Sequence, residues 1–168
     1  DALLQPEVEM RNANVEIPVL QYQEMIDELV KHEARNTYIA TVALIHCMSN
    51  RKSLILTKRV EHFKLIQAQL GDVKTVSVSS EDKDRVETLK KLKLLPGSFD
   101  ILLGTSALLG TGLDLPALDT LIIACDLKSD VLTDQSAGLI LRLFHNKKDP
   151  KIILDYYNRC SSVFKRIL

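Results

Sequence analysis

The chain has 168 residues, which is enough for one domain with a substantial hydrophobic core. Hydrophobic residues make up 46% of it and charged residues 26%, ordinary values for a globular protein that exclude an intrinsically disordered chain. Lysine plus arginine balance aspartate plus glutamate at 22 each. Net charge therefore gives no argument for nucleic-acid binding, which would have to rest on a local patch.

The cysteines and apolar runs bear on the compartment. Cys47, Cys125 and Cys160 stand far apart in apolar surroundings, and no CxxC or Cys/His spacing predicts zinc. We therefore expect buried, reduced thiols in an intracellular protein of the cytoplasm or nucleus. No apolar run has the length of a membrane span, and no secretory signal opens the sequence. Because the chain starts at Asp1 rather than at methionine, we expect it to be a segment of a longer protein.

The N-terminal region predicts a linker followed by a helix pair. Residues 1–20 contain two prolines and predict a linker that leads into an edge strand near Val15–Leu20. From Tyr22 to Asn50, apolar residues recur at helical spacing, and the pattern breaks near Glu33–Asn36. We therefore expect two helices before the first strand of the main sheet.

Strands and helices then alternate. Strands are predicted at Ser53–Thr57, Val73–Val78, Phe99–Gly104, Leu118–Ala124 and Lys151–Tyr157, and helices at Val60–Leu70, Ser79–Leu95, Val131–Phe144 and Asn158–Leu168. Because most of these strands are apolar along their length, they predict a parallel sheet covered by helices on both faces. We expect residues 21–168 to form a single α/β domain.

Polar groups follow two of the apolar strands. Phe99–Ala124 contains a strand, a glycine-containing loop with hydroxyls and a carboxylate, and a second strand. Gln135–Arg142 then presents a glutamine and an arginine on a predicted helix. This layout places polar groups at the carboxyl end of a parallel sheet, where open α/β folds bind ligands. The residue types suit phosphate chemistry, yet the chain has no GxxxxGK[ST] loop to cradle phosphates.

The order of elements and three motifs resembles the C-terminal (second RecA-like) domain of superfamily 2 helicases, a P-loop NTPase-like fold. SLILTKRVEHFKLIQAQL is similar to motif IV, GTSALLGTGLDLP to motif V and QSAGLILR to motif VI. EARN before a long helix, together with DLKSD, is similar to the DNA-translocase branch that includes the phage repair helicase UvsW and the poxvirus transcript-release helicase. The resemblance covers residues 35–157 and implies a virus- or phage-encoded protein.

The resemblance implies that one edge of the domain faces the nucleotide, and we call the residues there the nucleotide edge. Arg142 would act as an arginine finger, and Gln135, two helical turns earlier, would contact the γ-phosphate or the attacking water. Gly138 would let this helix approach closely, and Gly112 and Asp114 would lie beside the nucleotide. ATP with Mg²⁺ would be bound mainly by an N-terminal RecA-like domain that this chain lacks. The chain alone would then be inactive.

One departure from the motif leaves alternatives open. Motif VI usually reads Gln-x-x-Gly-Arg-x-x-Arg, and Leu139 replaces the first arginine. The chain could therefore be a degenerate helicase-like module that binds nucleic acid or protein without ATPase activity, or an unrelated flavodoxin-like domain. Taken without the neighbouring motifs, Arg142 also suits the exposed surface of an amphipathic helix. Asp114 likewise suits a turn in which its side chain hydrogen-bonds its own backbone.

Hydroxyl and basic residues after two strands predict a nucleic-acid edge. Thr105 and Ser106 follow one strand, and Thr57, Lys58 and Arg59 end the other. Such groups donate hydrogen bonds to phosphates and position a strand without reading its sequence. The alternatives are a helix N-cap for Thr105 and a solvated basic turn for the other segment. By resemblance, the partners are nucleic acid, DNA more than RNA, and the protein's own N-terminal domain, with no membrane.

Overall fold

The computed structural model describes residues 7–12, 22–111, 113–125 and 151–156. Its strands are β1 (Glu7–Asn12), β2 (Ser53–Thr57), β3 (Thr75–Val78), β4 (Ile101–Thr105), β5 (Thr120–Ile123) and β6 (Lys151–Tyr156). Its helices are α1 (Tyr22–Lys31), α2 (Glu33–Met48), α3 (Val60–Gln67) and α4 (Arg85–Leu94), with short 3₁₀ helices η1 (Pro96–Ser98) and η2 (Ser106–Thr111).

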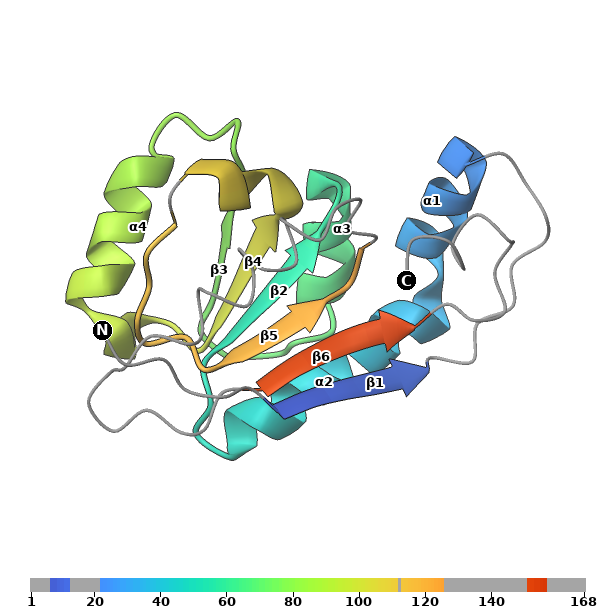
Figure 1. Cartoon of the computed structure of the whole chain (residues 1–168), viewed down its shortest axis with the longest axis horizontal. Helices are drawn as coiled ribbons and strands as arrows, with labels where there is room; N and C mark the ends of the chain where they lie inside the picture. The colour runs from blue at the N-terminus through green and yellow to red at the C-terminus, as the bar shows by residue number, and fades with distance from the viewer. Residues whose placement is uncertain (1–6, 13–21, 112, 126–150, 157–168) are drawn as a thin grey trace.

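The strands form one sheet in the order β1-β6-β5-β2-β4-β3 (Figure 1). Every described pairing is parallel, which confirms the predicted RecA-like, mostly parallel sheet. β2 lies between β4 and β5, so Ile55 pairs with Leu103 on one side and with Ile122 on the other. The central strands are buried along their whole length, as their continuous apolar runs predict.

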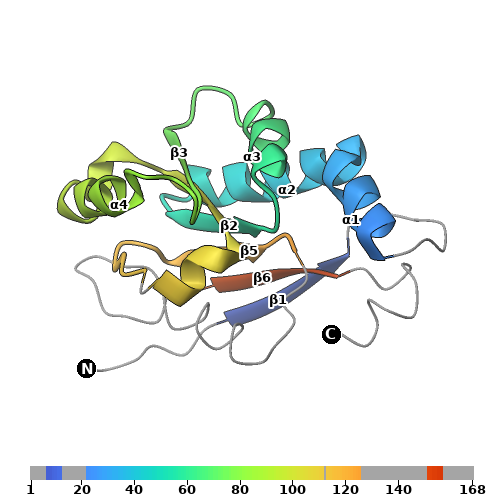
Figure 2. The same cartoon turned by 90° about the horizontal axis from the view of Figure 1, so that it is seen from above.

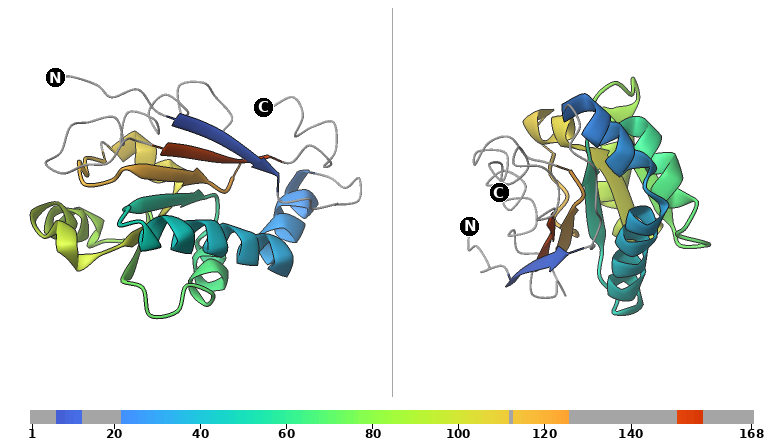
Figure 3. Two further views of the ribbon diagram at one scale, coloured as in Figure 1. Left: turned by 90° about the horizontal axis from the view of Figure 1, so that it is seen from below. Right: turned by 90° about the vertical axis from the view of Figure 1, so that its right-hand side faces the viewer.

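Alternate residues of each central strand enter two separate cores. Ile55 packs with residues of α2 and α3, including Ile39 and Phe63. Its neighbours Leu54 and Leu56 point to the other face, where they pack with residues of α4, η2 and the segment before β5. Figures 2 and 3 show α1, α2 and α3 together on one side of the sheet, with η2 on the other. The prediction of helical layers on both faces is therefore confirmed.

The helix pair also forms as predicted. α1 ends at Lys31 and α2 begins at Glu33, with His32 between them as the N-cap residue of α2. The His32 side chain accepts a hydrogen bond from the backbone N–H of Arg35, 3.2 Å away. This bond satisfies one of the amide groups that the first turn of a helix leaves unpaired, so it explains the break in the helical pattern.

The helix predicted to begin at Ser79 begins instead at Arg85. The intervening residues form a turn that their own side chains stabilise. The Asp82 carboxylate accepts from the Ser79 N–H at 2.7 Å, and the Ser79 hydroxyl accepts from the Glu81 N–H at 3.2 Å. Serine and aspartate side chains that bond nearby backbone groups compete with helix formation, so here they cap a turn and delay the helix.

β1 and β3 are the two edge strands of the described sheet, and β1 pairs with β6 and lies within the predicted N-terminal linker. The strand predicted at Val15–Leu20 and the helices predicted at Val131–Phe144 and Asn158–Leu168 lie outside the described residues. No helix in the described ranges combines the length and apolar character needed to cross a bilayer.

Candidate nucleic-acid and nucleotide interface

The carboxyl ends of β2 and β4 bring two predicted phosphate contacts together. Thr57 ends β2, Thr105 ends β4, and the two threonines are register partners in adjacent parallel strands. Neighbouring strands lie about 4.8 Å apart, so the two residues lie side by side at the carboxyl edge of the sheet. Ser106, half-buried, follows directly as the first residue of η2.

The two threonine hydroxyls differ in their bonding. The Thr57 side chain is fully buried, and its hydroxyl donates to the carbonyl oxygen of Arg59 at 3.2 Å. Thr105 is 6% exposed, and its hydroxyl has no hydrogen-bond partner within the described part of the chain. A buried polar group without a partner costs about 1–3 kcal/mol. The N-cap bond predicted as the alternative role for Thr105 is therefore not made among the described residues, and its hydroxyl keeps unused donor capacity.

The basic residues Lys58 and Arg59 after β2 are half-buried, and Arg59 bonds to side chains of α1. The Arg59 guanidinium donates from Nη1 to the Asp27 carboxylate of α1 and from Nη2 to Gln23 at 3.2 Å. Glu61 lies 3.6 Å from the same Nη1. The hydrogen bond to Asp27 raises the pKa of Arg59 above its ordinary value. Lys58 beside it is half-buried. The segment is thus tied to α1 by an ion pair between residues far apart in the sequence.

A buried arginine holds α1 in place below this segment. Arg35 is 1% exposed, and its guanidinium donates to the carbonyl oxygen of Leu29 at 3.2 Å and to that of Ala124 at 2.7 Å. Asn36 donates from Nδ2 to the carbonyl oxygen of Val30 at 2.8 Å. The last carbonyls of a helix have no partner within it, so these two side chains satisfy part of the C-terminus of α1.

His62 of α3 completes this buried network. Its Nε2 lies 2.6 Å from Asn36 Oδ1, and because an amide oxygen only accepts, the imidazole donates from Nε2. Burial, and then the positive charge of Arg35, lower the pKa of His62 to about 3. The imidazole is therefore neutral near pH 7. EARN resembles a family motif, but its sequence predicts no role for Arg35 and Asn36. Polar residues among the apolar ones of the buried face of α2, Arg35 and Asn36 with His46, are the available signal.

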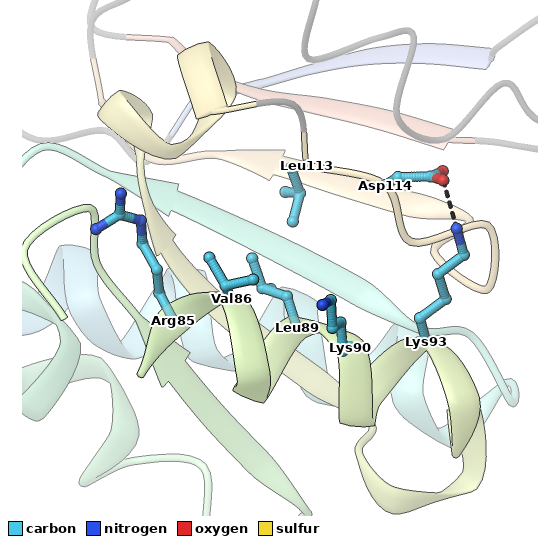
Figure 4. A pocket seen from close by; sticks show the side chains of 7 residues that line it. All are labelled: Arg85, Val86, Leu89, Lys90, Lys93, Leu113 and Asp114. Atoms are coloured by element: carbon cyan, nitrogen blue, oxygen red, sulfur yellow. Dashed lines mark hydrogen bonds and ion pairs between the residues drawn. The ribbon is translucent and has the colours of Figure 1, made fainter. Parts of the chain in front are cut away.

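Asp114 is the one predicted nucleotide-edge residue that the structure describes (Figure 4). Its carboxylate accepts from Lys93 Nζ of α4 at 2.6 Å, and Leu113 beside it is buried. Asp114 lies at one end of a pocket of about 270 Å³ whose other lining residues are Arg85, Val86, Leu89, Lys90, Lys93 and Leu113. The pocket thus combines an apolar floor from α4 with several cationic side chains.

The other predicted nucleotide-edge residues, Gly112, Gln135, Gly138 and Arg142, lie outside the described residues, so their gathering around Asp114 stays a prediction. Among the residues that the structure describes, no three histidine, cysteine or acidic side chains group together as metal ligands would.

Sequence relatives include viral transcript termination proteins and a putative viral helicase. The family model described as "Helicase conserved C-terminal domain" matches residues 36–143. Transcript termination protein A18 of Rabbit fibroma virus (strain Kasza) is 31% identical over 118 residues, covering 70% of this chain and 23% of the relative. The putative helicase 161L of Invertebrate iridescent virus 6 is 26% identical over 170 residues, covering 88% of this chain and 37% of the relative. The chain therefore spans well under half of these relatives.

Solved structures share the fold. T4 UvsW superposes with a TM-score of 0.62 at 17% identity, over 88% of this chain and 32% of that one. A fragment of a putative HsdR subunit of a type I restriction enzyme from Vibrio vulnificus YJ016 gives 0.71 at 20% identity, over 92% and 32%. The parallel sheet, the motif order and the family match lead to one assignment: this chain belongs to the helicase C-terminal domain family and has its RecA-like fold.

Proposed function

We propose that this chain is the C-terminal motor domain of an ATP-dependent superfamily 2 helicase or translocase encoded by a virus or phage. The observation that carries the proposal is the pairing of Thr57 with Thr105, which sets a buried hydroxyl with unused donor capacity at the carboxyl edge of the sheet. Membership of the helicase C-terminal domain family and the viral relatives support it.

Nucleic acid would bind along this edge through its phosphates. Thr105 and Ser106 would donate hydrogen bonds from one strand end, and Thr57, Lys58 and Arg59 would act from the next. Hydroxyls and cations of this kind hold the backbone of a single strand without reading its bases. We propose DNA rather than RNA, because the motifs resemble the DNA-translocase branch.

The nucleotide would bind at the far end of the segment that begins at Thr105 and continues through Asp114. Arg142 and Gln135 would approach the γ-phosphate, and Gly112, Asp114 and Gly138 would shape that edge. A bound ATP·Mg²⁺ supplies the phosphoryl group whose transfer an arginine finger accelerates by about 10³ to 10⁵. A preceding RecA-like domain would hold it, so this chain alone would not hydrolyse ATP. The whole protein would act inside the cell, in the cytoplasm or nucleus.

A second candidate rests on Leu139, which replaces the usual first arginine of motif VI. In that case the domain would bind nucleic acid or protein without driving hydrolysis. ATPase turnover separates the two candidates, measured on the full-length protein with and without single-stranded DNA. The motor proposal expects DNA-stimulated turnover that Arg142→Ala reduces at least 100-fold. Absence of turnover in the wild-type protein, with DNA binding retained, would favour the binding module.

A further inference from the structure

Arg59, a predicted phosphate contact, already donates its guanidinium N–H groups to acceptors within the protein. Nη1 donates to the Asp27 carboxylate, and Nη2 donates to Gln23 at 3.2 Å. A second carboxylate, that of Glu61, stands 3.6 Å from Nη1. Both terminal nitrogens of the guanidinium therefore have partners, and one positive charge faces two negative ones.

A phosphate cannot use this arginine without an exchange of partners. Arginine binds phosphate best through two parallel N–H donors, and here both terminal nitrogens point at α1 or at α3. The Asp27 carboxylate also lies where it would repel an approaching polyanion. Displacement of Asp27 removes both obstacles at once.

The exchange involves side chains rather than the helix that carries Asp27. α1 is anchored by bonds from buried Arg35 and Asn36 to the carbonyl oxygens of Leu29 and Val30. The side chains of Arg59 and Asp27, in contrast, are 29% and 47% exposed. Water and salt reach this ion pair, and exposed pairs of this kind shift an equilibrium by only about 1.4- to 5-fold. The bond is weak enough for a phosphate to replace it.

We propose that Asp27 competes with nucleic-acid phosphate for Arg59, and that this competition sets the affinity of the carboxyl edge for single strands. The inference rests on the proposed function, because it requires that a nucleic acid binds at this edge. It assigns an affinity-determining role to a residue of α1, which lies outside the three helicase-like motifs. Asp27 itself need not touch the bound strand.

The test measures binding of a fluorescent oligothymidylate to the full-length protein by anisotropy at several salt concentrations. Asp27→Asn keeps the shape of the side chain and removes its charge, so we expect binding about two- to fivefold tighter than wild type. Glu28→Gln is the matched control. It removes the same charge from an exposed neighbour on the same helix, and we expect a change below about 1.5-fold.

A double-mutant comparison identifies the route of the effect. If Asp27 acts through Arg59, Asp27→Asn gains nothing in an Arg59→Gln background, and the two Arg59→Gln proteins bind alike. Weaker or unchanged binding by Asp27→Asn overturns the inference, because Asp27 would then position Arg59 or play no part. An equal gain with and without Arg59 also overturns it, because the effect would be general repulsion. Thermal melts of each variant establish that all are folded.

Failure of the proposed function gives a different pattern. If the wild-type protein does not bind the oligonucleotide, or if Thr105→Val leaves its binding unchanged, the carboxyl edge is not a nucleic-acid site and both proposals fail. If Thr105→Val weakens binding while Asp27→Asn does not strengthen it, only the competition is wrong.

Discussion

The Nη2 group of Arg35 lies 2.7 Å from the carbonyl oxygen of Ala124, a residue 89 positions later in the chain. The same guanidinium donates to Leu29 at the end of α1. One buried side chain therefore joins the start of α2, the end of α1 and the end of β5.

Replacing Arg35 with methionine should lower the free energy of unfolding by about 2–4 kcal/mol. The change removes a donor from two buried carbonyl oxygens, of which that of Leu29 keeps a longer bond of 3.4 Å from the His32 N–H, and a buried polar group that loses its hydrogen bond costs about 1–3 kcal/mol. Urea denaturation of the full chain measures the loss. Lys64→Met, on the exposed side of α3, is the control and should stay within about 0.5 kcal/mol of wild type. Equal stabilities for the two variants would contradict the role assigned to Arg35.

The neutral His62 predicts a loss of stability in acid. Its pKa is about 3 in the folded chain, whereas an unfolded histidine titrates near 6.5. The unfolded state therefore binds the extra proton as the pH falls from about 6.5 towards 3. Over that window His62 reduces the free energy of unfolding by up to about 1.4 kcal/mol per pH unit, and above pH 7 it has no such effect.

Urea titrations of wild type and His62→Gln between pH 4 and 8 test this sign. Glutamine keeps an N–H donor for Asn36 and has no proton to gain, so the variant should lose less stability on acidification than wild type. Parallel pH profiles would show that His62 is not the titrating group.

Thr105 and Thr57 should respond oppositely to replacement by valine. The Thr105 hydroxyl has no partner in the described chain, so Thr105→Val should leave stability unchanged or raise it by up to about 1 kcal/mol. Thr57→Val removes the bond to Arg59 and should lower stability by about 1 kcal/mol. If Thr105 donates to a phosphate, its replacement should still weaken single-strand binding about 2- to 12-fold. A lower free energy of unfolding for Thr105→Val would contradict the finding that the Thr105 hydroxyl forms no hydrogen bond within the described chain.

Asp114→Asn distinguishes a coupling role from a turn aspartate. The ion pair with Lys93 has side chains 51% and 35% exposed, so its loss should cost less than about 1 kcal/mol. If Asp114 lies at the nucleotide edge, Asp114→Asn should lower the DNA-stimulated ATPase turnover of the full-length protein at least tenfold. The control is Lys93→Gln, which breaks the same ion pair and should leave turnover within about twofold. Equal turnover for both variants would make Asp114 structural.

Gly104 should not accept a methyl group. A Cβ added there would lie 3.1 Å from Leu108 Cδ1 and 3.3 Å from Leu54 Cδ1, inside a packed core. Gly104→Ala should therefore cost about 1–3 kcal/mol in thermal or urea unfolding. Gly97→Ala meets no atom within 4 Å and should stay within about 0.5 kcal/mol of wild type. Tolerance of Gly104→Ala would mean that the Leu108 side chain moves aside readily.

The sequence predicted the central strands well because their signal is local. Ser53–Thr57 is apolar throughout and forms β2 with the predicted bounds, and the strand predicted at Phe99 begins two residues later, at Ile101. β1 was missed because EVEMRN alternates charged with other residues at the edge of the sheet, where no continuous apolar run is required. The start of α4 was wrong because side-chain bonds within Ser79–Asp84 stabilise a turn.

The placement of the phosphate-contact candidates was predictable in part. Parallel strands end at one edge, so the sequence could place Thr57 and Thr105 near each other. It could not predict which hydroxyl is used within the chain, because Thr57 bonds a carbonyl two residues on while Thr105 finds none. The ion pair between Arg59 and Asp27 and the burial of Arg35 depend on tertiary packing of α1, which no local pattern encodes.

The pairing of β1 with β6 joins the first and last described strands of the chain. During synthesis from the N-terminus, β1 is made before β6 and must wait for all the residues between them before this neighbour exists. A nascent or truncated chain without Lys151–Tyr156 would expose the backbone donors and acceptors of both β1 and the outer side of β5. Such open edges promote aggregation, so shortened versions of this protein that end before β6 should be recovered mainly as insoluble material.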